Sequence, residues 1–338
     1  MQIHKRRFDK DRNLSERPGI YDGLRFFPFA AGTKVLFLRG RICYTDFINN
    51  RVRRKEKERH MKLHVLHAGY IRVSREVPFG DRTDLKTVGK MLAAPDRERV
   101  TLPVCCYLLE HPQGPVLIDT GWGREISPNG VYDPAAVSRC LPQRLAAFYR
   151  PWVPAGMTVR EQLIARGLGP EDLKCIVLTH LDPDHVAGLH SLRGAQRVVL
   201  PEDEYFWSCR TVFKLRQPRT FWIDEPIERL YYRGSPLGPN RWAIDLFGDE
   251  SVQLINVPGH TDGQAAVLIR NGARFVLLAA DAAFSPRNWE EEITPGFGFG
   301  RDWQLRSLRW LGSMAADPNC AAVLCSHDAD SKPGTIEF

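Results

Sequence analysis

Seven histidine and aspartate side chains in this 338-residue chain have the types and the spacing of metal ligands. Four of them fall within the six residues His180-Leu181-Asp182-Pro183-Asp184-His185. The other three, His260, Asp281 and His327, are separated from one another in the sequence. Imidazoles and carboxylates together suit divalent first-row metals such as zinc. A centre of this composition can support metal-assisted hydrolysis or, with iron, redox chemistry.

Each ligand or group of ligands follows a predicted strand. Residues 175–179 form a short apolar run typical of a buried strand, and the four clustered ligands come directly after it. Strands predicted at 252–257, 274–280 and 321–325 precede the other three. A single histidine after a strand is more often a structural or surface residue than a ligand. Four such placements together favour a metal site.

The other predicted elements alternate between strand and helix. Thr158 and Glu161 have the spacing of a capping box, which predicts a helix that starts there and ends at Gly167. The remaining predictions are a hairpin of strands 101–109 and 115–119, a strand at 264–269 and a helix at 302–314. This interleaving of strands and helices predicts an α/β fold.

Composition limits the classes of protein that this chain can belong to. Its residues are 43% hydrophobic, yet the sequence contains no apolar run long enough to span a membrane and no signal peptide at its start, so a cytoplasmic protein is expected. The eight cysteines include no Cys-x-x-Cys pair, and several lie in apolar runs, which is typical of buried, reduced thiols.

Charge divides the chain into two predicted parts. Residues 1–60 hold 16 Lys and Arg against 7 Asp and Glu, a net charge of +9, whereas the remaining 278 residues hold 31 against 33, a net charge of −2. Nucleic acid is therefore not expected as a partner of the folded domain. We expect a basic N-terminal extension over 1–60, poorly ordered or a mis-assigned start with Met61 as the natural initiator, and one domain over 61–338.

Three sequence motifs accompany the ordered set of ligands. They are Leu-Pro-Val-Cys-Cys-Tyr-Leu-Leu-Glu at 102–110, Gly-Pro-Val-Leu-Ile-Asp-Thr-Gly at 114–121 and Pro-Gly-His-Thr at 258–261. With them, residues 62–330 resemble hydrolases of the metallo-β-lactamase fold, and most of all the N-acyl homoserine lactonase group. The resemblance implies a four-layer αβ/βα sandwich with the site at one edge of two sheets.

The resemblance also implies how the ligands are shared between two divalent ions. Site one would comprise His180, Asp182 and His260, and site two would comprise Asp184, His185 and His327, with Asp281 bridging them. A metal-bound hydroxide would open a small-molecule ester or lactone, with N-acyl homoserine lactone as a candidate and a thioester as a variant, while Asp184 moves the proton. Zinc is expected first, with manganese or iron as alternatives.

The chain departs from the family pattern at two positions that bear on function. The usual motif is His-x-His-x-Asp-His, whereas position 182 is Asp. Two divalent ions, three aspartates and one hydroxide sum to zero charge, one unit less than in the usual site, which favours harder ions and motivates a di-iron redox or oxygen-handling protein as the alternative. The lactonases also carry a Tyr where this chain has Phe284, so a hydroxyl near the substrate is missing unless another residue supplies it.

Three further residues lie close in sequence to predicted site elements or follow a predicted strand as the candidate ligands do. The family resemblance implies that Asp119 is structural and does not bind metal, although it too follows a predicted strand. Trp122 and Phe284 are close in sequence to site elements and are candidates to line the substrate pocket, but aromatic residues in such positions are as often ordinary core. The sequence indicates neither the identity of the substrate nor the oligomeric state.

Overall fold

The computed structural model describes residues 61–81, 85–210 and 216–338, together with the backbone of three short strands between residues 26 and 43. The chain divides into two units, residues 1–57 and 58–338. In the first unit, β1 (Phe26–Pro28), β2 (Lys34–Leu38) and β3 (Arg41–Cys43) form an antiparallel sheet. The charged run before Met61 lies outside the described residues, so the nature of the extension stays a prediction.

Two mixed sheets make up the second unit. The strands of the first, in spatial order, are β16 (Gly334–Glu337), β4 (Lys62–Ser74), β5 (Arg99–Glu110), β6 (Val116–Ile118), β7 (Cys175–Val177), β8 (Val198–Pro201) and β9 (Ile227–Leu230). Those of the second are β10 (Arg233–Gly234), β11 (Trp242–Asp245), β12 (Val252–Asn256), β13 (Ala265–Asn271), β14 (Arg274–Ala280) and β15 (Cys320–Cys325). The parallel pairs run from β6 to β9 and between β14 and β15.

The sheets pack face to face because both faces of their strands are apolar. Successive side chains of a strand point to opposite faces. In β13, Val267 packs in the core between the sheets with Tyr107 and Val177 of the first sheet, whereas its neighbour Leu268 packs in a separate core on the outer face. Strands buried on both faces in this way need a layer of helices on each outer side.

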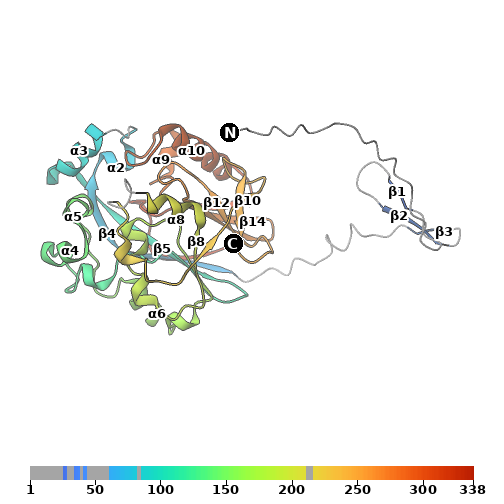
Figure 1. Ribbon diagram of the computed structural model, residues 1–338, viewed down its shortest axis with the longest axis horizontal. Coiled ribbons are helices and arrows are strands. Elements are labelled where there is room, and N and C mark those ends of the chain that lie inside the picture. Colours follow the sequence, from blue (N-terminus) through green and yellow to red (C-terminus); the bar gives the residue numbers. More distant parts are fainter. Residues whose placement is uncertain (1–25, 29–33, 39–40, 44–60, 82–84, 211–215) are drawn as a thin grey trace, which may run out of the picture. The chain divides into compact units, whose positions relative to one another are not determined.

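Helices supply those two outer layers. On the first sheet, Leu163 of α6 (Val159–Ile164) packs in one core with Ile176 of β7. On the second, Leu308 of α10 (Arg301–Ala315) packs in one core with Leu277 of β14. Figure 1 shows α10 beside α9 (Pro286–Glu290) on one side of the domain and α6 on the opposite side. The predicted four-layer αβ/βα sandwich is confirmed.

Four further helices cover the end of the domain where β4 and β5 extend beyond their neighbours. They are α2 (Glu76–Phe79), α3 (Leu85–Ala93), α4 (Pro134–Cys140) and α5 (Gln143–Tyr149). Side chains such as Met91 of α3 and Phe148 of α5 pack in one core with Ile71 and Val73 of β4. This cluster of helices brings α5 to the side of the domain that carries the candidate site.

Most of the predicted elements are present, with shifted ends. The capping box exists, since Thr158 Oγ1 accepts from the backbone N–H of Glu161 at 3.2 Å and Glu161 Oε2 accepts from that of Thr158 at 3.0 Å. Gly167 closes the helix as predicted: Ile164 is the last helical residue, and Gly167 forms the left-handed turn after it, with φ of +73°. The strand predicted at 175–179 stops at Val177, so that residues 178 and 179 already belong to the ligand loop.

Two other expectations concern the state of the cysteines and the presence of membrane-spanning helices. The cysteines whose side chains are described are all free thiols, and four of them, Cys105, Cys106, Cys175 and Cys325, are buried. Burial raises the pKa of Cys105 and of Cys175 to about 12, so these thiols are unreactive packing groups. Across the described part of the chain, no helix has both the length and the apolar character needed to cross a membrane.

Candidate metal centre

The fold brings all seven predicted ligands to the ends of strands in one buried cluster. His180 follows β7, and Asp182 caps the one-turn helix α7 (Pro183–Val186), which carries Asp184 and His185. The others lie in the loops after β12, β14 and β15. None of the seven is more than 3% exposed; the set is His180, Asp182, Asp184, His185, His260, Asp281 and His327.

Each of the four histidines is held in the tautomer that a metal requires. The Nδ1 atoms of His260 and His327 lie 2.9 Å from Phe297 O and 2.8 Å from Pro103 O, and a carbonyl can only accept, so each Nδ1 carries the hydrogen. The Nδ1 of His185 donates to Asp119 in the same way, at 2.8 Å. His180 Nδ1 lies 3.0 Å from Thr179 Oγ1, whose own hydrogen goes to Asp119 Oδ2.

With the hydrogen on Nδ1, each imidazole in its neutral form offers Nε2 to a metal ion, and three of these Nε2 atoms are buried without a hydrogen-bond partner among the described residues. These are the Nε2 atoms of His180, His185 and His327, and the Oδ1 atoms of Asp184 and Asp281 are orphaned in the same sense. Buried polar atoms without a partner are costly unless something else binds them. A divalent cation fits this donor set.

The distances between ligand atoms fit two sites joined by Asp281. Its Oδ1 lies 3.2 Å from His185 Nε2 and 3.3 Å from His327 Nε2, whereas its Oδ2 lies 3.4 Å from His260 Nε2 and 4.0 Å from His180 Nε2. Ligands about 2.1 Å from a tetrahedral zinc are about 3.4 Å apart. Each oxygen of Asp281 thus faces a different pair of histidines, as the predicted bridging role requires.

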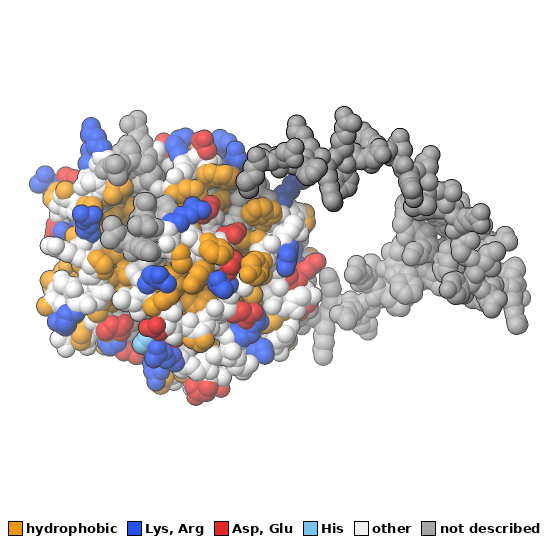
Figure 2. Space-filling model, viewed as in Figure 1, with side chains coloured by type: hydrophobic (Ala, Val, Ile, Leu, Met, Phe, Trp, Pro, Cys, Tyr) orange, Lys and Arg blue, Asp and Glu red, His pale blue; other side chains and the backbone are white. Residues whose placement is uncertain are grey.

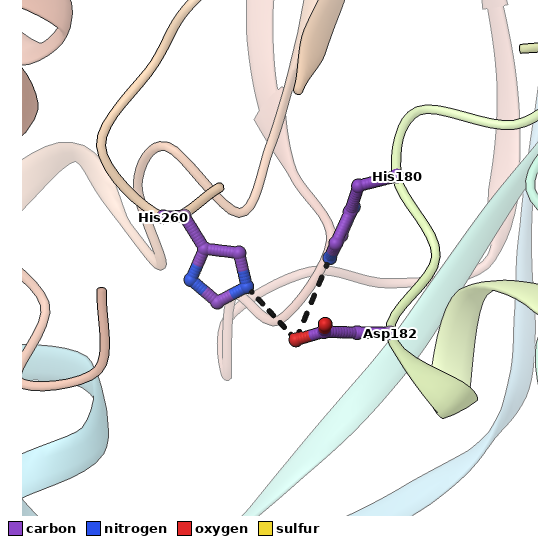
Figure 3. A group of neighbouring side chains, drawn as sticks. All are labelled: His180, Asp182 and His260. Carbon is purple, nitrogen blue, oxygen red and sulfur yellow. Dashed lines mark hydrogen bonds and ion pairs between the residues drawn. The ribbon is translucent and has the colours of Figure 1, made fainter. Parts of the chain in front are cut away.

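The two candidate sites differ in the side chains that already contact their ligand atoms. In site two, Asp184 Oδ2 lies 3.3 Å from His327 Nε2. In site one, His180 and His260 both point toward Asp182, with Nε2 to Oδ2 distances of 3.9 and 3.2 Å (Figure 3). Both oxygens of Asp182 also accept hydrogen bonds from Arg216, which the sequence did not indicate. Site two fits a metal ion without further change, whereas site one already holds a cationic side chain.

The electrostatics of the cluster favour positive charge. Burial would raise the pKa of Asp281, but the facing His327 and His185 outweigh it and hold that pKa well below its ordinary value. Burial would likewise lower the pKa of His327, yet without a bound metal ion Asp281 and Asp184 raise it to about 10, so that metal binding there displaces a proton from Nε2. The pKa of His180 falls because of burial and the neighbouring His185. Ionised carboxylates beside imidazoles are the environment in which a divalent cation is stabilised.

Asp119 connects the cluster to its supporting loop, as expected of a structural residue. Besides His185, it accepts from the backbone N–H and the hydroxyl of Thr179, each at 2.8 Å. Its φ of +59° is uncommon for a residue with a side chain. Asp119 therefore orients His185, a candidate ligand, and its own oxygens are not among the clustered ligand atoms.

A second supporting group, missed in the sequence, surrounds site one. The carboxylate of Glu204, in α8 (Glu202–Cys209), accepts from Leu181 N at 3.1 Å, Gln217 Nε2 at 2.8 Å and Thr261 Oγ1 at 2.5 Å. Burial raises the pKa of Glu204 to about 7, although the bonds from Thr261 and Gln217 oppose this shift. Glu204 links the loop of His180 to the loop of His260.

The aromatic candidates for the substrate pocket have different surroundings. Trp122 is fully buried and packs edge-on against Tyr149, so it belongs to the core. Phe284 is 3% exposed and stacks on the ring of His327 at 5.2 Å. Tyr149, at the end of α5, has its hydroxyl 3.5 Å from Asp182 Oδ2. A phenolic hydroxyl therefore lies at the centre, but it comes from a helix 33 residues before the ligand rather than from position 284.

A surface hollow of about 810 Å³ lies elsewhere, against β9, β10 and β11. Residues such as Arg229, Tyr231 and Ile244 line it, and none of the seven clustered residues does. This hollow is therefore separate from the metal centre.

The architecture and the buried centre define a class: an αβ/βα sandwich with a histidine and aspartate cluster at the ends of its strands. The Metallo-beta-lactamase superfamily matches residues 153–327, and the chain belongs to this superfamily. The match spans from the residues before α6 to His327. Membership makes the protein a metallo-hydrolase of this fold.

Proteins named as N-acyl homoserine lactonases are similar in sequence to most of this chain. It is 27% identical over 238 residues to the N-acyl homoserine lactonase AttM of Rhizobium radiobacter, covering 68% of this chain and 83% of the relative. It is 28% identical over 254 residues to an N-acyl homoserine lactonase of a Bacillus species, covering 71% and 87%. A crystal structure of an N-acyl homoserine lactone hydrolase, with N-hexanoyl-L-homoserine bound at its catalytic metal centre, matches the fold with a TM-score of 0.61 at 22% identity, covering 80% of this chain and 94% of that one.

Proposed function

We propose that the protein hydrolyses the ester bond of a lactone or a related ester, with N-acyl homoserine lactones as the first candidates. The observation that carries this proposal is the set of buried Nε2 atoms without a hydrogen-bond partner, which lie beside buried carboxylate oxygens. The seven residues named above would hold divalent metal, zinc first and manganese or iron as alternatives. When bound, such an ion polarises a carbonyl oxygen and lowers the pKa of a bound water.

Asp184 is suited to move the proton in this reaction. Its Oδ2 faces His327, and its Oδ1 has no hydrogen-bond partner among the residues with described placement. A carboxylate with one oxygen committed and one available can take a proton and return it to the leaving alcohol. The proton would thus stay within the buried cluster until the alcohol leaves.

Tyr149 is the candidate for the hydroxyl that Phe284 lacks. Its O–H lies beside Asp182, and burial, together with the charges of Asp182 and Asp184, raises its pKa well above the ordinary value. The phenol therefore stays protonated and can donate to a substrate carbonyl. Phe284, stacked on His327, would instead present an apolar face to the acyl portion.

The partner that this function requires is a small molecule. Lys and Arg are interspersed with Asp and Glu over the face of the domain visible in Figure 2, in keeping with its nearly balanced charge. A surface of this kind does not favour a polyanion such as nucleic acid. The cytoplasmic location stays a prediction from the sequence.

The alternative function, a di-iron redox or oxygen-handling protein, requires the carboxylate of Asp182 to bind iron. Both oxygens of this carboxylate accept hydrogen bonds from Arg216, and Gln217 donates to Oδ1 as well. The carboxylate therefore has a partner other than iron, and we favour the hydrolase. Two iron ions with a redox-active absorption band and no hydrolysis would reverse this preference.

The test is hydrolysis by the full-length protein after loading with zinc or manganese. The substrates are N-acyl homoserine lactones of several chain lengths, a simple γ-lactone, an aryl ester and a thioester. Tyr149→Phe is expected to lower kcat about 10- to 100-fold with unchanged metal content, whereas Phe284→Tyr is expected to leave or raise it. A folded protein that holds metal and turns over none of these substrates contradicts the proposal.

A further inference from the structure

Arg216 is a charged side chain, only 11% exposed, that lies against the ligands of site one. Its Nε lies 2.9 Å from both oxygens of Asp182, and its Nη2 donates to Asp182 Oδ2 at 2.6 Å. The same Nη2 lies 2.5 Å from His260 Nε2, and Nη1 donates to His260 O at 2.9 Å. The guanidinium thus contacts two of the three ligands of site one.

The contact with His260 uses the lone pair that a metal ion would need. Because His260 Nδ1 donates to Phe297 O, a neutral His260 has no hydrogen on Nε2, and this atom lies 2.5 Å from Arg216 Nη2 and 3.2 Å from Asp182 Oδ2. Arg216 donates to that lone pair, whereas the Nε2 atoms of the other three clustered histidines have no such donor among the described residues. One lone pair cannot serve a guanidinium and a metal ion at once, so the two cations compete for His260.

Several groups hold the guanidinium in this position. It lies over the ring of Phe297 at 4.2 Å and near the ring of Trp207 at 5.5 Å, both favourable arrangements for a cation. The next residue, Gln217, donates to Asp182 Oδ1 at 3.1 Å and to Glu204 at 2.8 Å. Two aromatic rings and the hydrogen bonds of the following Gln217 therefore fix Arg216 and its partner Asp182 in the site.

The charges explain why the arginine accompanies this particular aspartate. Asp182 stands where the family pattern has a neutral histidine, which adds one negative charge to a fully buried site. Arg216 adds one positive charge at 2.6 Å from it and restores the balance. A divalent ion entering site one would meet a cation already in contact with two of its ligands.

We propose that Arg216 is the resident cation of site one, so that the protein binds one divalent ion tightly at Asp184, His185, His327 and Asp281, and a second only weakly at site one. This inference deepens the proposed function and rests on it, since it requires metal at the centre. Asp182 and Arg216 together take the place that a histidine and a metal ion would otherwise fill. The second ion enters only when the guanidinium releases His260.

The test is a metal count that does not depend on activity. The full-length protein is stripped with a chelator, titrated with Zn²⁺ or Mn²⁺ in a calorimeter, and analysed for bound metal after gel filtration. The wild type is expected to retain close to one ion per chain and to bind a second at least about 100-fold more weakly, a difference of two powers of ten in Kd. Arg216→Gln is expected to retain close to two.

Two further variants keep the test interpretable. Arg124→Gln is the matched control, since Arg124 also forms a two-bond pair with a carboxylate, that of Glu161, away from the ligands; its metal count should equal that of the wild type. Because Arg216→Gln leaves Asp182 buried without its partner, Asp182→His/Arg216→Gln is the variant to use if the single change does not fold. It is likewise expected to retain two ions.

The outcomes separate the inference from the proposed function. Two tightly bound ions in the wild type, with hydrolysis intact, overturn the role of Arg216 and leave the hydrolase standing. A wild type that binds one ion, and variants at Arg216 that also bind one, overturn it as well. Absence of any metal from every variant contradicts the proposed function itself.

Discussion

Replacing Asp119 by Asn tests whether the supporting hydrogen bonds control the metal centre. Asp119 is 1% exposed and accepts three hydrogen bonds, from His185 Nδ1 and from two groups of Thr179. Asn has the same shape but one acceptor oxygen fewer. An amide NH₂ in the position of Oδ2 would face the N–H of His185, so that donor meets donor.

The size of the effect follows from what is lost. One buried donor left without an acceptor costs about 1–3 kcal/mol of folding free energy. Loss of the partner that fixes a histidine ligand typically lowers metal affinity about 10- to 100-fold, which is about 1.4–2.7 kcal/mol. We expect Asp119→Asn to raise the Kd of the tighter-bound ion by that factor and to lower the melting temperature by several degrees.

The assay is competition for zinc with a chromophoric chelator, with thermal unfolding measured alongside. Asp133→Asn is the matched control, because Asp133 caps α4 by accepting from Ala135 N and Ala136 N, and Asn caps helices as well as Asp does. Its Kd should not change. If Asp119→Asn lowers the melting temperature but leaves the Kd within about twofold, Asp119 supports the fold alone and the reasoning from His185 is wrong.

Three further substitutions test the scaffold. Gly259, directly before His260, has a φ of +137°, and a Cβ there would lie 2.6 Å from the backbone N of Gln304. We expect Gly259→Ala to lower the free energy of unfolding by about 1–3 kcal/mol and to lower metal retention. An unchanged melting temperature would contradict this expectation. Leu308→Ala removes a fully buried side chain from the core under α10 and should lower the free energy of unfolding in urea by about 2–5 kcal/mol; a loss below 1 kcal/mol would mean that α10 repacks. Burial alone would raise the pKa of Asp81, but hydrogen bonds from Arg301 and Thr294 outweigh it and hold this pKa below its ordinary value. The ionised Asp81 therefore stabilises the fold above the ordinary pKa, and this stabilisation is lost as pH falls through the pKa of the folded state. Asp81→Asn should lower the free energy of unfolding by less than about 1 kcal/mol at neutral pH, since the pair is exposed, and should leave it unchanged in strong acid. An equal loss at both pH values would exclude the ion pair as the cause.

The ligand cluster was predictable because its signal is local. The clustered run from His180 to His185 follows an apolar strand, and His260, Asp281 and His327 each follow another. Parallel and antiparallel strands of two packed sheets can bring such ends together, so residue type and strand position together sufficed. The predicted strands and the capping box were recognisable for the same reason, with errors of at most two residues at the ends of the strands.

The surroundings of site one were not predictable, since they depend on contacts between distant segments. Arg216 lies 34 residues from Asp182 and 44 from His260, in a stretch whose sequence carries no motif. No motif in the sequence marks Glu204 or Tyr149. Their proximity to the centre is set by how α5 and α8 pack, which local periodicity does not encode.

The pairing of β16 with β4 brings the two ends of the second unit together. Gly334 to Glu337 run antiparallel to Lys62 to Val65, and Lys62 and Glu337 form an ion pair at 3.1 Å. A short flexible linker could therefore join residue 337 to residue 62, and new termini could be opened in an exposed turn, in a circular permutant with the same sheet order. Removing β16 instead would expose the backbone N–H and C=O groups along one edge of β4, which is a surface prone to pairing with other chains.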